Sequence, residues 1–429
     1  MAIAPAAQPP TPVPRAAAAP RSAPSGDPHG APPRERHSPP PAAPSTPPAA
    51  VGIALAGMAA LASGMGIGRF VYTPILPAMA EGLGLASTSA GLIASANFVG
   101  YLAGALLAAT PLPGARRTWF LGALAVGALS TILMGMVGTM PAFLALRCVG
   151  GVASAIVLVI GSVLVLDALA AVGRSRLAPL HFAGVGVGIV VSALVVSGLE
   201  AAGQGWRALW IGAGVAAALA VPVAVWGLPA REAAAPPVPS GGAPGGVRRG
   251  PVAALAVCHG LFGFGYIVTA TFLVAVVRAS PGARAFEALV WPVVGLAAAL
   301  SVLLWGRLGA RIGVLPLYGA ACLVEAVGVA VGGFWPTPAG ALLSALLLGG
   351  TFMGITALGF SAARALAPGE ERRVSALITA AFGLGQIVGP VLAGWLLDRA
   401  GGFALPSGIA AGALVVGGIM ALGTARAVR

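Results

Sequence analysis

Twelve long apolar segments, six on each side of one polar stretch, constrain this chain more than any other feature. From about residue 51 onward the sequence is dominated by Ala, Val, Leu, Ile and Gly, and only 8% of the whole chain is charged. A soluble domain usually has about a quarter of its residues charged. Because a helix of roughly 20 apolar residues crosses a bilayer, the pattern predicts an all-α integral membrane protein with twelve transmembrane helices.

The apolar runs also predict where the helices lie. Transmembrane barrels need alternating segments of about ten residues, and the sequence lacks that pattern. The 64 glycines suit helices in lipid, where small faces let two backbones approach closely. We predict spans at residues 52–79, 88–110, 118–137, 141–166, 178–199, 207–228, 252–277, 286–305, 314–333, 338–362, 375–397 and 405–425.

Two polar regions divide the chain into parts. Residues 1–50 are dominated by Pro and Ala, a composition that predicts a disordered tail. Residues 229–250 are rich in Pro, Gly and Ala and predict a flexible linker. The remaining residues, 51–228 and 251–429, are predicted to form two six-helix bundles.

The basic residues predict the orientation. All 24 of them are Arg, and if the first residue is cytoplasmic, 18 fall on the cytoplasmic side of the spans and four on the other. The positive-inside rule then places both termini, with the tail and the linker, in the cytoplasm. Exclusive use of Arg is typical of a GC-rich bacterial genome, which predicts a bacterial inner membrane. The net charge of +13 is spread over loops rather than on one face, so it does not indicate nucleic-acid binding.

The two halves resemble each other. Residues 184–192 (GVGVGIVVS) and 382–390 (FGLGQIVGP) are similar at an offset of 198, and Glu200 and Asp398 follow at the same offset. Parallel repeats of this kind predict two pseudo-symmetric bundles, with a solute site near the bilayer midplane between them.

Several short motifs indicate a family. They are GMGIGRFVYTPILP (64–77), SANFVGY (95–101), RCVGGVASA (147–155), FGFGY (262–266), GRLGARIG (306–313) and FGLGQIVGP (382–390). With these motifs the chain resembles the major facilitator superfamily along everything after residue 50, and its YbfB/YjiJ-type branch in particular. This resemblance implies the fold of two six-helix bundles, transport by alternating access and a monomer.

One of these motifs implies a gate. Residues 306–313 are similar to the superfamily's short-loop motif, so the resemblance places Arg307 and Arg311 in a gating loop. Ala310 stands where that motif has Asp, which puts the role of the missing carboxylate in doubt.

Arg69 and Arg147 are charges inside predicted spans. A charge at the bilayer centre costs about 2.5–3.5 kcal/mol on insertion scales and needs a partner or a water-filled cavity. Arg69 lies eight residues before Pro77, where we predict that the first span ends, and Arg147 lies six residues after Pro141. Two guanidinium groups at similar depth suit a clamp for a carboxylate or phosphate. The alternative is structural: Arg147 binding backbone carbonyls and Arg69 extending toward the outer interface.

Other polar side chains in the spans are candidates for binding the solute. The first predicted span contains Gly64, Gly66, Gly68 and Pro74, which predict a loosened helix. Such a helix could expose its backbone to the solute, or its kink could serve packing alone. The candidate substrate-binding residues besides the two arginines are Tyr72, Asn97, Tyr101, Tyr266 and Gln386. Each can equally form a hydrogen bond to a neighbouring helix.

Proton coupling needs a titratable group near the cavity. Glu325 is the carboxylate predicted to lie deep in a span, and His181 titrates nearer to neutral pH. Both are proton-coupling candidates. The alternatives are a paired structural Glu, which is favoured, and a His that is only hydrogen-bonded.

The motifs of bound-cofactor chemistry are missing from the sequence. It has no P-loop, no CxxC pair and no HExxH, and its three cysteines show no ligand spacing, so we predict no catalytic residue, cofactor or metal. The sequence predicts a secondary active transporter of a small solute, such as an organic anion, coupled to protons. The alternatives are a proton-driven efflux pump for hydrophobic drugs, a membrane-embedded enzyme acting on lipid-linked substrates, and a non-transporting sensor.

Overall fold

The computed structural model describes residues 47–229, 248–280 and 282–428. Within these ranges it has twelve helices that are long and apolar enough to cross a membrane, which confirms the predicted spans. Most of the predicted tail, 1–50, and of the predicted linker, 229–250, lies outside the described residues.

The twelve membrane spans divide equally between two halves, six in each. The N-terminal half contains α1 (Pro47–Leu61), η1 (Ala62–Ile67), α2 (Tyr72–Leu83), α3 (Ser87–Ala108), α4 (Arg116–Met134), α5 (Met140–Ala171), η2 (Ser175–Leu177), α6 (Ala178–Ala201), α7 (Trp206–Ala218) and α8 (Ala220–Gly227). The C-terminal half contains α9 (Arg249–Ala279), η3 (Arg284–Phe286), α10 (Glu287–Ile312), α11 (Val314–Phe334), α12 (Pro338–Leu366), α13 (Glu371–Ala400) and α14 (Ala404–Val428).

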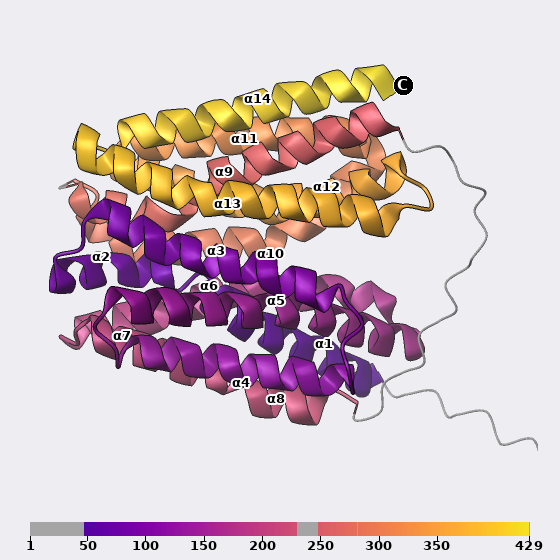
Figure 1. Cartoon of the computed structure of the whole chain (residues 1–429), viewed down its shortest axis with the longest axis horizontal. Coiled ribbons are helices and arrows are strands. Elements are labelled where there is room, and N and C mark those ends of the chain that lie inside the picture. The colour runs from indigo at the N-terminus through magenta and orange to yellow at the C-terminus, as the bar shows by residue number, and fades with distance from the viewer. Residues whose placement is uncertain (1–46, 230–247, 281, 429) are drawn as a thin grey trace, which may run out of the picture. The chain divides into compact units, whose positions relative to one another are not determined.

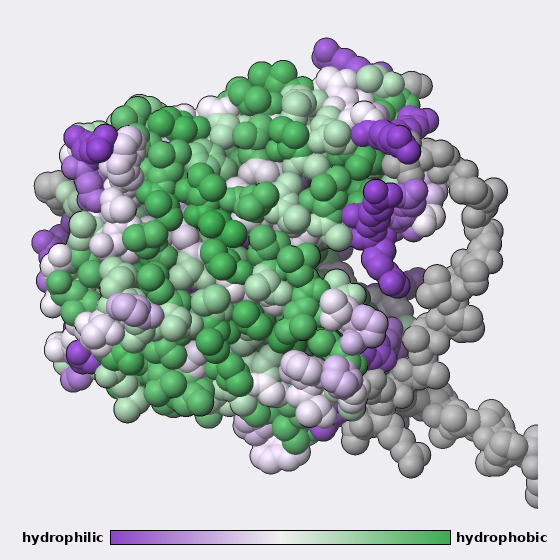
Figure 2. All heavy atoms as spheres, in the orientation of Figure 1, coloured by the Kyte–Doolittle hydropathy of each residue, from purple (hydrophilic) through white to green (hydrophobic). Residues whose placement is uncertain are grey.

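An apolar belt surrounds the helices. Figure 2 shows hydrophobic residues over the middle of the visible face and hydrophilic residues at both ends. Large apolar side chains such as Leu219 and Leu300 are 66% and 67% exposed. Lipid tails are the solvent that such a surface fits.

The first span is broken in its middle, as its glycines predicted. It consists of α1, the π-helical turn η1, a non-helical turn at residues 68–71, and α2. A Cβ on Gly66 would overlap the backbone of Gly188 on α6, so the close approach requires glycine.

The predicted end of this span at Pro77 is wrong, because α2 continues to Leu83 with Pro77 inside it. Membrane helices tolerate such prolines, since neighbouring groups satisfy the freed backbone. Arg69 therefore lies 14 residues (83 − 69) before the end of the span rather than eight. At about 1.5 Å per residue, that places it about 20 Å from the end.

The two halves meet along three helix pairs, namely α3 with α13, α6 with α10, and α2 with α9. Figure 1 shows α3 beside α13, and shows α1 beginning and α14 ending at the same end of the helices. We call that end the termini side and the opposite end the far side. Glycines make the approach possible, because a Cβ on Gly91 would overlap the carbonyl of Pro390, and one on Gly186 the carbonyl of Gly295.

Candidate functional site

Arg147 binds the backbone of the broken span. Its Nη1 donates to the carbonyl of Gly68 at 3.2 Å and its Nη2 to the carbonyl of Arg69 at 3.3 Å. In a regular helix the amide of Thr73 would bond to Arg69, but here it donates to Phe70 instead. The guanidinium group therefore occupies carbonyls that the break in the helix has freed.

The surroundings of Arg147 come from the N-terminal half. Its guanidinium lies 5.3 Å from the ring centroid of Tyr72 and 5.8 Å from that of Trp210. Asn97 donates to the carbonyl of Arg147 at 3.0 Å, and the Tyr72 hydroxyl donates to the carbonyl of Ala90 at 2.9 Å. Three predicted site residues, Tyr72, Asn97 and Arg147, thus bind one another or nearby backbone.

Arg69 instead faces the other half. Its Nη2 makes a long hydrogen bond of 3.4 Å to the hydroxyl of Tyr266, and Gln386 donates to that same hydroxyl. Its guanidinium carbon lies over three rings of its own half, 4.3 Å from the centroid of Tyr101, 5.0 Å from Phe98 and 5.3 Å from Phe70. Four predicted site residues, Arg69, Tyr101, Tyr266 and Gln386, therefore come together across the interface.

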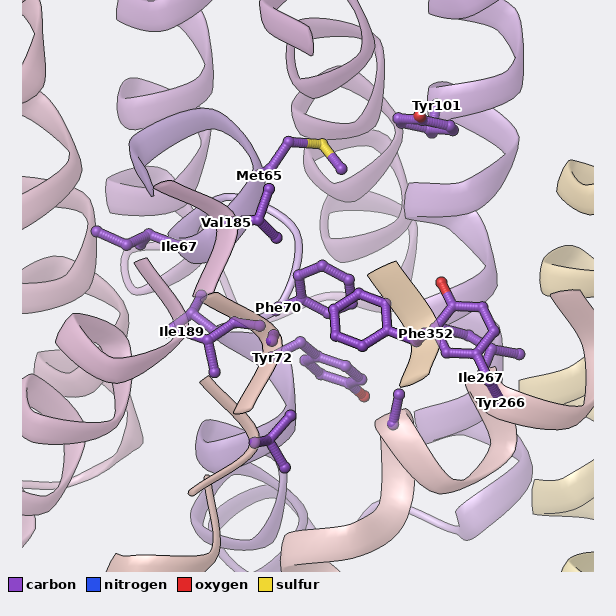
Figure 3. Close-up of a cluster of buried hydrophobic side chains, with 14 of the residues drawn as sticks. Met65, Ile67, Phe70, Tyr72, Tyr101, Val185, Ile189, Tyr266, Ile267 and Phe352 are labelled. Carbon is purple, nitrogen blue, oxygen red and sulfur yellow. The ribbon is translucent and has the colours of Figure 1, made fainter. Parts of the chain in front are cut away.

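Aromatic rings enclose this meeting point. Tyr266 stacks against Phe352 and Phe382 at centroid distances of 5.8 and 5.7 Å, with planes 3° and 2° apart. Phe70 meets Phe352 edge to face at 5.8 Å, so the rings join the two halves (Figure 3). We call the six rings the aromatic shell; they belong to Phe70, Phe98, Tyr101, Tyr266, Phe352 and Phe382.

The charge of Arg69 has no acidic partner among the described residues. Its side chain is buried, with the residue only 4% exposed, and its Nε has no hydrogen-bond partner in that part of the chain. The Oε1 of Gln386 is also buried and unpartnered there. A charge within a membrane span is expensive unless it is paired or hydrated, so this arrangement can accept an anion.

The two proton-coupling candidates bond to side chains other than Arg69. Glu325 on α11 accepts a hydrogen bond from Thr351 at 2.9 Å, and its other oxygen has no partner among the described residues. His181 on α6 shares a hydrogen bond of 3.1 Å with Ser162 of α5. Both side chains are buried, and their proposed roles in proton transfer stay predictions.

The predicted gating loop is not a loop. Arg307 and Arg311 lie exposed on the last turns of α10, which runs to Ile312. The connection to α11 consists of Gly313 alone, whose φ of +96° lets one residue make the turn. The placement of these arginines in a loop is therefore wrong.

Charged side chains join the halves on the far side. Arg278 at the end of α9 pairs with Glu200 of α6 at 2.8 Å, with Glu287 of α10 at 2.5 Å and with Glu81 of α2 at 3.7 Å. Glu200 and Glu81 belong to the N-terminal half, whereas Arg278 and Glu287 belong to the C-terminal half.

Asp398 forms a second contact of this kind. The N-terminus of α3 has no side-chain cap within its own half, and the carboxylate of Asp398 on α13 accepts from the amides of Ser87 and Thr88, each at 2.8 Å. Glu200 and Asp398, which hold equivalent places in the two repeats, thus both reach into the opposite half. We call the contacts of Arg278 and Asp398 the far-side latch.

Comparison with known proteins identifies the family. The family described as "Uncharacterised MFS-type transporter YbfB" matches residues 61–422. The chain belongs to this family. It is therefore a multi-pass membrane protein of the major facilitator superfamily, as its motifs predicted, and no curated protein matches it by sequence.

Solved structures share the fold of this YbfB-type chain. The nucleoside transporter NupG matches with a TM-score of 0.65 at 16% identity, over 88% of this chain and 99% of that one. A bacterial homologue of the human lysosomal transporter Spinster, in an inward-facing and occupied conformation, matches with a TM-score of 0.64 at 15% identity, over 88% and 96%. At these identities the likeness concerns the fold alone.

Sequence reasoning missed the phenylalanines of the aromatic shell in this YbfB-type chain. A Phe in an apolar span ordinarily packs in the core, so it carries no signal by itself. A weak signal was available, because Phe70 directly follows Arg69 and Phe98 directly follows Asn97. Phe352 has no such neighbour among the predicted site residues, and only the structure places it here.

The two arginines should respond differently to substitution. Replacing Arg147 by Gln leaves the carbonyls of Gly68 and Arg69 without their charged donor, which should destabilise the protein by about 1–3 kcal/mol. Replacing Arg69 by Gln removes one long hydrogen bond and its contacts with three rings, but also a buried charge without an acidic partner, so these opposing effects should leave the stability close to that of the wild type. Thermal unfolding of both variants in detergent measures the difference, and a larger loss in Arg69→Gln would contradict this assignment.

Proposed function

We propose that this chain is a secondary active transporter of a small organic anion, with Arg69 as the anion-binding group. The observation that carries the proposal is the buried guanidinium of Arg69, which lacks an acidic partner among the described residues and lies where the halves meet. An anion there would supply the missing countercharge. Arg suits this role because its planar group can bind a carboxylate through two parallel hydrogen bonds.

The position of Arg69 also gives a reason for alternating access. Its backbone is held by Arg147 of the N-terminal half, and its side chain bonds to Tyr266 of the C-terminal half. An anion at this point would touch groups of both halves, so its binding energy would depend on how the halves are tilted. A ligand shifts a conformational equilibrium only through such differences in affinity.

The far-side latch supports a state that opens toward the termini side. Both of its contacts join the halves at the far side, where α3 also packs closely against α13 at Gly91 and Pro390. By the distribution of arginines, we propose that the termini side is the cytoplasmic side of a bacterial inner membrane.

Proton coupling is the second element of the proposal. Glu325 is a fully buried carboxyl group whose bonded partner is the neutral Thr351. Burying an isolated carboxylate in an apolar environment is costly, so a change in its surroundings during transport would favour the uptake or release of a proton. His181, bonded to Ser162, is the other candidate.

Binding of organic acids tests the anion-binding role directly. Wild-type protein in detergent should be stabilised by at least one carboxylate, since a ligand at a hundred times its Kd adds about 2.7 kcal/mol. Arg69→Gln should lose this stabilisation. The matched control is Arg399→Gln, because Arg399 is exposed near the far end of α13 and lies over Trp395.

A different set of stabilising ligands would contradict the proposal that the site binds an anion. Stabilisation by hydrophobic cations alone, unchanged in Arg69→Gln, would instead support the efflux of hydrophobic drugs.

If Glu325 carries the coupled proton, Glu325→Gln should impair gradient-driven uptake but not exchange. Uptake of the anion into liposomes driven by a pH gradient should fall at least tenfold, whereas exchange of labelled for unlabelled anion without a gradient should continue. Glu370→Gln serves as the matched control, because Glu370 is an exposed acid that pairs with Arg373, and it should keep gradient-driven uptake. Gradient-driven uptake at the wild-type rate in Glu325→Gln would remove this residue from the coupling mechanism.

The far-side latch predicts a change in accessibility. Ser197 lines a small cavity on the far side together with Pro74 and Trp291, so a cysteine placed there reports on opening. In a background whose three native cysteines are replaced by Ala, we expect the pair Arg278→Gln and Asp398→Asn to raise its labelling by an impermeant maleimide severalfold. Individual exposed ion pairs contribute little, which is why both contacts are removed together.

The control for this labelling experiment is Arg373→Gln. Arg373 pairs with Glu370 near the opposite end of α13, so its loss should leave the rate unchanged. An equal rate in the latch variant and the control would show that these contacts do not hold the far side closed.

A further inference from the structure

The surroundings of Arg69 are unusual for an anion site because they consist mainly of rings. Three rings lie around the guanidinium of Arg69 and two more stack on its partner Tyr266, whereas the polar groups nearby are the hydroxyls of Tyr101 and Tyr266 and the Gln386 amide. A sugar phosphate or a polyhydroxylated acid would bury several hydroxyls here with few partners, which opposes its binding. The solute should therefore be apolar apart from its charged group.

The rings also share an orientation. The planes of Phe352 and Phe382 lie within 3° of the plane of Tyr266, and these three side chains come from α12, α13 and α9. Phe70 approaches Phe352 at an interplanar angle of 67°, with its edge toward that ring. The shell thus offers the two geometries in which aromatic rings attract each other, parallel stacking and edge-to-face contact.

All six rings of the shell are buried, and two of them keep the most accessible surface. Phe382 is 9% exposed and Tyr101 7%, whereas neighbouring core rings such as Phe262 are fully buried. Gln386, one helical turn beyond Phe382, donates to the hydroxyl of Tyr266. The aromatic shell and the partner of Arg69 are therefore parts of one buried cluster.

We propose that the site selects anions that carry a planar aromatic ring, with monocarboxylates of benzoate size as the solute class. The inference rests on the proposed function, because the carboxylate is taken to bind Arg69. The ring then packs against the aromatic shell, whose members come from both halves.

A pair of matched ligands separates ring selection from simple apolar burial. Benzoate and cyclohexanecarboxylate have the same number of carbon atoms and the same charge at pH 7.5, but the saturated ring is thicker, more hydrophobic and has no π face. A merely apolar pocket would prefer cyclohexanecarboxylate. An aromatic shell should bind benzoate about fivefold or more tightly, as measured by titration calorimetry on the full chain in detergent.

Substitution of the shell should remove the preference without removing the anion site. In Phe352→Leu and in Phe382→Leu, benzoate affinity should fall to that of cyclohexanecarboxylate, which itself should change less than twofold. Phe272→Leu is the matched control, because Phe272 lies on α9 and pairs with Phe403, outside the shell. It should keep the wild-type ratio of affinities.

The outcomes distinguish the two proposals. Equal binding of both ligands to the wild type, or tighter binding of cyclohexanecarboxylate, would overturn ring selection and leave the anion-binding role of Arg69 in place. Failure of both ligands and of other organic acids to bind would overturn the proposed function itself. The comparison on the wild type decides ring selection even if a Phe variant does not fold.

Discussion

The rest of the structure depends on one electrostatic constraint: a guanidinium group is buried in a membrane span without a carboxylate to balance it. Arg69 is surrounded by rings and held by one long hydrogen bond to Tyr266. Such a group is tolerated because the π faces attract the cation. The attraction is partial, and under the proposed function an anion would supply the remaining countercharge where the two halves meet.

The break in the first span positions that charge. Glycines let η1 approach α6, the turn at residues 68–71 frees backbone carbonyls, and Arg147 binds two of them. Two arginines that look alike in the sequence therefore have different binding partners in the structure. Arg147 is anchored to the backbone and stiffens the turn, so that the side chain of Arg69 can point toward the opposite half. The hydrogen bonds from Arg147 thus compensate, within the N-terminal half, for backbone hydrogen bonds that the broken helix lacks.

The spans and the family could be predicted from the sequence because hydropathy and short motifs are local signals. The contact of Arg69 with Tyr266, and of Tyr266 with Gln386, could not be predicted, although each residue was a candidate, because it depends on how the turn at residues 68–71 packs against α9 and α13. Pro77 misled the prediction, since proline ends soluble helices but is accommodated in a membrane span. The aromatic shell could not be predicted because a phenylalanine that packs against Arg69 or Tyr266 and one elsewhere in the core look the same in an apolar sequence.

The central claim is that an anion binds at Arg69 between the halves. The most direct measurement is an experimental structure of the protein with p-iodobenzoate, whose iodine can be located by its anomalous scattering. The account predicts the carboxylate within about 3 Å of the Arg69 guanidinium, with the iodinated ring beside Phe352 and Tyr266. A ligand found elsewhere in the protein, with Arg69 still bonded only to Tyr266, would contradict it.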